Sequence, residues 1–167
     1  RGGIVCGEPL GKPARVALGK AEVLREGKDV TLLALGSMVY PALDASTRLR
    51  AQGIEAAVVN ARFVKPLDRI MLRQVATQTG ALVVIEEGQV AGGFGSAVSE
   101  ALDAMQLSRV TLLRIGLPDQ FIEQGTRAQL LQLCQLDPES VTRRIAAWHA
   151  TLKTPTEDLR LLADPAA

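Results

Sequence analysis

The sequence is poor in the residues on which metal sites and disulfide frameworks depend. Its 167 residues include two cysteines and a single histidine. Cys6 and Cys134 lack CxxC spacing and have no visible activating partner, and His149 alone cannot complete a common zinc site. We therefore expect no structural metal and two inert cysteines, and we interpret His149 as a solvated residue of a helix.

Long apolar runs and an excess charge of one sign are also absent. The longest apolar runs, such as residues 81–85, are far shorter than the roughly 20 residues of a transmembrane helix, and the first residues do not resemble a signal peptide. Nineteen Lys and Arg balance 18 Asp and Glu, which leaves a net charge of +1. This composition predicts no membrane span and no general attraction for nucleic acid. It favours a soluble protein of a reducing compartment.

Short apolar segments alternate with segments of helical spacing. The hydrophobic content of 47% is sufficient for the core of one domain. Apolar segments predict five strands, at residues 21–24, 30–35, 56–59, 82–85 and 110–115. From the second onward they are almost continuously apolar, which is typical of parallel strands covered on both faces. Helical stretches lie between them, so the sequence predicts a three-layer α/β/α domain, with helices at about residues 40–52, 69–78 and 96–105.

Several helix starts carry a local signal. Asp68 can cap a helix that begins at the next residue, and Thr126 with Gln129 matches a capping box. Asp137 followed by Pro138 predicts the start of the last helix. An apolar stripe on that helix should pack on the sheet, and it consists of Val141, Ile145, Trp148 and Leu152.

The ends of the chain differ in character from its middle. Residues 1–19 contain scattered glycine and proline without a hydrophobic period, which predicts a linker from a preceding domain. Residues 153–167 predict a loosely held tail. The domain itself is expected to span residues 20–152. The start at Arg1 instead of Met favours a fragment or a processed form.

Charged residues and a glycine-rich segment gather at the predicted strand ends. In open α/β sheets this edge binds ligands, and glycines there let backbone N–H groups approach an anion. The sequence therefore indicates either an anion site or an interface loop, composed of Arg62, Lys65, Glu86, Glu87, Gly92, Gly93, Gly95 and Ser96. The spacing is not GxGxxG, so the glycines can instead have a steric role.

The adjacent carboxylates allow two interpretations. Glu86 and Glu87 could act as a general acid and base, yet neighbours on a strand point to opposite faces, which favours contacts with an adjoining domain or subunit. Arg62 could pair with either carboxylate across the sheet edge. The sequence shows no complete active site, so residue chemistry alone indicates an assembly or regulatory domain.

Three segments resemble the 1-deoxy-D-xylulose-5-phosphate synthase family of the transketolase superfamily. They are residues 62–68 (RFVKPLD), residues 86–96 (EEG leading to GGFGS) and residues 116–125 (GLPDQFIEQG). The resemblance runs from Arg1 to about Trp148 and implies the C-terminal domain of such an enzyme, a mostly parallel five-stranded sheet with an antiparallel first strand. Gly88 and Gln124 depart from the asparagine and histidine common in the family.

The resemblance also implies a chemistry. Enzymes of this family join pyruvate to D-glyceraldehyde 3-phosphate and release carbon dioxide, forming a precursor of isoprenoids and thiamine. Thiamine diphosphate and Mg²⁺, held by the first two domains, supply the reactivity. The resemblance therefore implies no catalytic residue, no cofactor and no activity in this chain alone. Its implied partners are the N-terminal domains and a second copy in a homodimer, in the cytoplasm of a bacterium rather than in a plastid.

One substrate residue is implied at the start of the chain. Arg1 with Gly2 resembles the end of the family's RYPRG segment, whose last arginine grips the phosphate of glyceraldehyde phosphate. Other interpretations stay open: the same domain of transketolase or of a 2-oxoacid dehydrogenase beta subunit, or a free-standing α/β domain that binds a partner or a small anion.

Overall fold

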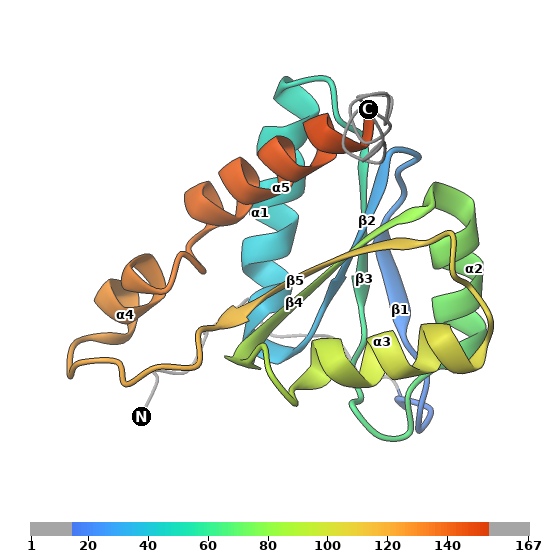
Figure 1. Ribbon diagram of the computed structural model, residues 1–167, viewed down its shortest axis with the longest axis horizontal. Helices are drawn as coiled ribbons and strands as arrows, with labels where there is room; N and C mark the ends of the chain where they lie inside the picture. The colour runs from blue at the N-terminus through green and yellow to red at the C-terminus, as the bar shows by residue number, and fades with distance from the viewer. Residues whose placement is uncertain (1–14, 154–167) are drawn as a thin grey trace, which may run out of the picture.

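A computed structural model describes residues 15–153 as a mixed sheet between layers of helices (Figure 1). The strand order is β1-β3-β2-β4-β5. β1 pairs with β3 in the antiparallel sense, and the other neighbours are parallel. The strands are β1 (Glu22–Arg25), β2 (Val30–Ala34), β3 (Ala56–Asn60), β4 (Ala81–Gln89) and β5 (Thr111–Leu117). The α/β class and the antiparallel first strand are confirmed.

Helices cover both faces of the sheet. On one face lie α1 (Val39–Ala51) and α5 (Pro138–Lys153), and on the other lie α2 (Arg69–Thr79) and α3 (Phe94–Ala104) (Figure 1). A short 3₁₀ helix, η1 (Gly36–Met38), joins β2 to α1. α4 (Arg127–Leu133) lies beyond the end of β5 (Figure 1). Every predicted strand and helix is present, and β4 differs most from its predicted range because it continues past its apolar run to Gln89.

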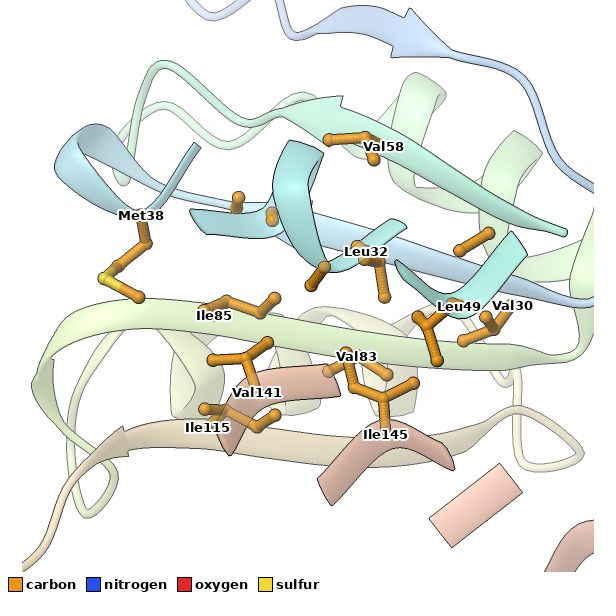
Figure 2. Close-up of a cluster of buried hydrophobic side chains, with 14 of the residues drawn as sticks. Val30, Leu32, Met38, Leu49, Val58, Val83, Ile85, Ile115, Val141 and Ile145 are labelled. Atoms are coloured by element: carbon orange, nitrogen blue, oxygen red, sulfur yellow. The ribbon is translucent and has the colours of Figure 1, made fainter. Parts of the chain in front are cut away.

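The core is divided by the alternation of side chains along the strands. Val83 and Ile85 belong to the cluster shared with α1 and α5, whereas Leu82 and Val84 belong to the cluster under α2 and α3. Figure 2 shows the first cluster, in which Ile145 of α5 lies against Val83. Val141 and Ile145 are fully buried, which confirms that the last helix packs on the sheet, whereas Leu152 at the end of the predicted stripe is exposed.

Two expectations about exposure are wrong. His149 is buried, with 6% of its surface accessible, because it follows Ile145 by four residues and so lies on the core-facing side of α5. β5 is not covered along its whole length, since Thr111 and Arg114 are exposed. The cause is its position, because β5 is the edge strand of the sheet and has a neighbour on one side only.

The predicted helix caps are confirmed. The Asp68 carboxylate accepts the backbone N–H of Met71 at 3.1 Å, and Thr126 and Gln129 form both hydrogen bonds of a capping box. Asp137 accepts the N–H of Ser140 at 3.0 Å. Within residues 15–153, the helices are too short or too polar to cross a membrane. The predicted linker and tail fall mostly outside the described residues, so the domain boundaries stay predictions.

Candidate functional site

The carboxyl edge of the sheet, where the parallel strands end, contains a topological switch point between β2 and β4. The chain leaves β2 through α1 toward β3 and leaves β4 through α3 toward β5, on the opposite face. Open α/β sheets bind ligands in the crevice that such a divergence creates. Here the chain's own side chains bridge the crevice: the Ser37 hydroxyl, just after β2, donates to the Glu87 carboxylate of β4.

Glu87 has a second, stronger partner on α4. The Arg127 guanidinium donates to both carboxylate oxygens, with Nε 3.2 Å from Oε1 and Nη2 2.6 Å from Oε2. These hydrogen bonds from Arg127, together with the one from Ser37, lower the pKa of Glu87, although partial burial opposes the shift. Glu87 is therefore an ionised structural link between η1, β4 and α4.

Glu86 points to the other face of the sheet, as the alternation along a strand predicts. Its side chain is buried, and it accepts the backbone N–H of Phe94 at Oε2 and that of Gly95 at Oε1, each at 2.8 Å. These donors belong to the first turn of α3, where unpaired N–H groups and the helix dipole favour negative charge. The chain thus supplies its own anion at this helix terminus. Binding of an external anion stays a prediction, and these two N–H groups are not available for it.

The glycine-rich loop closes tightly around Glu86. A Cβ atom on Gly93 would lie 2.0 Å from the backbone oxygen of Gln89 and 2.6 Å from the Glu86 carboxylate. The Ser96 hydroxyl accepts the Gly92 N–H at 3.1 Å and lies 3.2 Å from Nη1 of Arg114. The close approach at Gly93 supports the steric interpretation of this glycine.

The RFVKPLD segment holds the chain as it enters the domain. Arg62 has a φ of 58° and forms an ion pair with Glu22 of β1, with Nη2 and Oε2 2.5 Å apart. The expected pairing of Arg62 with a carboxylate is present, but the partner is Glu22 instead of Glu86 or Glu87. The reason is the strand order, because Arg62 follows β3, which lies beside β1, whereas both glutamates lie on β4 beyond β2.

Two further residues of the segment contact the entering chain. The Asp68 carboxylate that caps α2 also accepts the Ala21 N–H at 3.1 Å. Gly19, with a φ of 68°, packs so closely on Pro66 that a Cβ atom would come within 2.8 Å of its Cγ. We refer to Arg62, Pro66 and Asp68 as the entry clasp. Lys65 is exposed on the same loop.

The predicted site residues therefore form two groups, and β2 lies between them at the carboxyl edge of the sheet. Arg62 and Lys65 lie at the end of β3, while the glutamates and the glycine loop lie at the ends of β4 and β5. Sequence reasoning missed Ser37 and Arg127, the two partners of Glu87. Neither stands in a recognisable motif, and each is at least 40 residues from Glu87, so only the folded chain reveals them. Arg1 lies outside the described residues.

An apolar pocket of about 370 Å³ opens beside the Glu87–Arg127 pair. It lies between the end of β5, the following loop and α4. Cys134, whose residue surface is 7% accessible, forms part of its wall. The other apolar residues of the wall are Leu117, Ile122, Leu130 and Leu131.

The residues of the carboxyl edge do not fit a site for thiamine diphosphate and magnesium. Among residues 15–153 no group of three or more His, Cys, Asp or Glu side chains is placed to hold a metal ion. Glu86 is committed to the first turn of α3 and Glu87 to Ser37 and Arg127. We therefore assign no cofactor and no catalytic step to these residues.

The described residues form a three-layer α/β/α domain. At the carboxyl edge of its sheet, Glu86 and Glu87 are hydrogen-bonded to other groups of the same chain. A family model described as "Transketolase, C-terminal domain" matches residues 19–141. The chain belongs to this family. The three segments that carry the sequence resemblance all lie within the matched residues.

Curated relatives make the comparison more specific. The chain is 49% identical over 128 residues to 1-deoxy-D-xylulose-5-phosphate synthase 1 of Geobacter metallireducens, which covers 77% of this chain and 20% of that protein. It is 48% identical over 143 residues to the synthase of Thermomicrobium roseum, covering 85% of this chain and 22% of that protein. The chain thus spans about a fifth of the length of these relatives.

Solved structures share the fold. One described as a split gene transketolase, inactive beta4 tetramer, has a TM-score of 0.76 and 40% identity, covering 84% of this chain and 45% of that one. A transketolase from Pichia stipitis has a TM-score of 0.56 and 22% identity, covering 81% of this chain and 18% of that one. The latter likeness concerns the fold alone.

Proposed function

We propose that this chain is the C-terminal domain of a 1-deoxy-D-xylulose-5-phosphate synthase. Such an enzyme condenses pyruvate with D-glyceraldehyde 3-phosphate to 1-deoxy-D-xylulose 5-phosphate and carbon dioxide, for isoprenoid and thiamine synthesis. The identities of 48–49% to proteins of this name support the assignment. The intact protein is a thiamine-diphosphate- and Mg²⁺-dependent transferase of the bacterial cytoplasm.

Within that enzyme the domain has a structural role. The observation that carries this proposal is made at the switch point between β2 and β4. There Ser37 and Arg127 both donate hydrogen bonds to the Glu87 carboxylate. The Glu86 carboxylate is likewise engaged, by two backbone N–H groups in the first turn of α3. In this domain the two carboxylates stabilise the carboxyl edge, and the cofactor is held by the domains that precede it.

Calorimetry with thiamine diphosphate and Mg²⁺ tests whether cofactor binding requires the preceding domains. The intact enzyme should bind the cofactor and convert pyruvate, whereas the isolated 167-residue chain should do neither. Circular dichroism must first show that the isolated chain is folded, so that a failure to bind is informative. Tight binding by the folded chain would refute the structural role.

The second candidate is transketolase. The 40% identity to the split gene transketolase is the observation that favours it. The reactions differ in their donors, because the synthase decarboxylates pyruvate while transketolase moves a ketol unit between sugar phosphates. Release of carbon dioxide from pyruvate by the intact enzyme, in the presence of glyceraldehyde 3-phosphate, decides for the synthase.

We further propose that the intact enzyme is a homodimer. The split gene transketolase is described as an inactive beta4 tetramer, an assembly of identical chains without activity. A domain with a structural role is suited to such association. Light scattering on the intact enzyme measures the number of chains, and a monomeric mass at working concentration would contradict the proposal.

A further inference from the structure

The loop after β5 and the helix that follows it expose an unusual amount of apolar surface. Phe121 is fully exposed, and Leu133 is 64% exposed. α4 itself contains no buried residue. Ile122, Leu130 and Leu131 line the pocket, and Phe121 and Leu133 adjoin them in the sequence. We call these five residues the α4 surface. Such a patch on a soluble domain marks a site of contact with another surface.

The α4 surface shares an edge of the domain with the incoming polypeptide. Because β1 is antiparallel to β3, its first residue, Glu22, lies opposite Asn60, the last residue of β3. The entry clasp holds residues 19–22 at this carboxyl edge. β5 is parallel to β4, so its end and the following loop lie at the far end of the same edge (Figure 1).

The distance along this edge is short on the scale of a protein domain. Four strand spacings of about 4.8 Å separate β1 from β5, or roughly 19 Å. A domain of about 100 residues has a radius of gyration of roughly 13 Å, so it is wide enough to lie over both ends. The matched segment makes up 20–22% of these relatives, whose remaining length is sufficient for such a partner.

We propose that the α4 surface is the docking site for the preceding domains of the same polypeptide, which lie upstream of residue 1 in the sequence. Phe121 is the anchor that inserts into this partner, because aromatic residues dominate the energy of such contacts. The 370 Å³ pocket receives an apolar side chain in return. Asp119 and Arg127 lie nearby and form part of a polar rim. The inference rests on the proposed function, which supplies the preceding domains.

A photo-crosslinking experiment on the intact protein tests the docking. p-Benzoylphenylalanine replaces Phe121, and in a matched control it replaces Ser108, which is exposed before β5 at the opposite edge. After irradiation, mass spectrometry should place crosslinks from position 121 on peptides upstream of residue 1, with none from position 108. Crosslinks from position 121 to residues 15–153 of a second copy, or a pattern equal to that of the control, would overturn the proposal.

A pair of substitutions provides an independent measurement. In Phe121→Ser and Leu133→Ser the lost side chains are exposed within this domain, so its own core should be unaffected. In the intact protein, amide hydrogen exchange over residues 117–134 should become roughly ten-fold faster, as loss of an interface anchor requires. Unchanged exchange would overturn the docking. Synthase activity of the unmodified enzyme tests the proposed function separately, so the two can fail independently.

Discussion

The Glu86 carboxylate and the backbone N–H of Gly95, 2.8 Å apart, join the end of β4 to the first turn of α3. The second carboxylate oxygen binds Phe94 in the same way. An acidic residue that appears catalytic in the sequence is therefore an internal cap for a helix. The glycine-rich loop, which resembles a phosphate loop in outline, is shaped to admit that carboxylate.

Glu86→Gln should destabilise the domain by about 1–3 kcal/mol. The amide oxygen can accept one of the two backbone N–H groups, but the amide NH₂ cannot accept the other, which is left unpaired in a buried position. Urea denaturation of the chain measures the free energy of unfolding. Glu100→Gln is the matched control on the exposed side of α3 and should change it by less than about 0.5 kcal/mol. Equal losses in the two variants would contradict the capping role.

The Glu87–Arg127 pair should make part of the stability depend on pH. The folded pKa of Glu87 is lowered, so its stabilisation is present above the ordinary glutamate value of about 4.3 and is lost as the pH falls through the lower folded value. Both side chains are partly exposed, which limits the contribution to about 0.2–1 kcal/mol. Arg127→Gln should therefore be less stable than the wild type near neutral pH.

This difference should shrink as the pH falls below the lowered folded pKa of Glu87, because the carboxyl is then protonated in both proteins. Urea denaturation at a series of pH values from about 7 downward, at low ionic strength, measures it. A difference that stays constant across this range would show that Arg127 acts through packing instead of charge.

Asp68→Ala should weaken two elements at once. The loss of the α2 cap costs about 0.5–2 kcal/mol, and the Ala21 N–H loses its acceptor in the entry clasp. Hydrogen exchange should therefore become faster at Ala21 as well as in the first turn of α2. Thr126→Ala removes the cap of α4 and is the matched control, since it should leave the Ala21 amide unchanged.

Arg1→Ala in the intact enzyme should raise the KM for D-glyceraldehyde 3-phosphate by roughly ten-fold to a hundred-fold, the range for losing a hydrogen bond to a charged group. The KM for pyruvate should change little, because pyruvate carries no phosphate. Arg15→Ala, at an exposed arginine in the same part of the chain, is the control. An unchanged KM for the aldehyde would remove Arg1 from the substrate site.

The entry clasp shows how a sequence motif can be recognised before its role is understood. RFVKPLD stands out as a specific segment, and Asp68 is predictable as a helix cap because its acceptor meets donors only three residues away. Its contact with Ala21 and the pairing of Arg62 with Glu22 span 47 and 40 residues. No local pattern signals contacts of that length.

The sequence by itself determined the elements and their class. Apolar runs of strand length, helical spacing and capping residues act over a few neighbouring positions, so the five strands and the helices between them could be predicted. Tertiary structure decided which side chains meet. The strand order placed Arg62 beside β1 and away from Glu86, and it left β5 at an edge of the sheet. Period and composition carry no information about strand order, because the order follows from packing between distant parts of the chain.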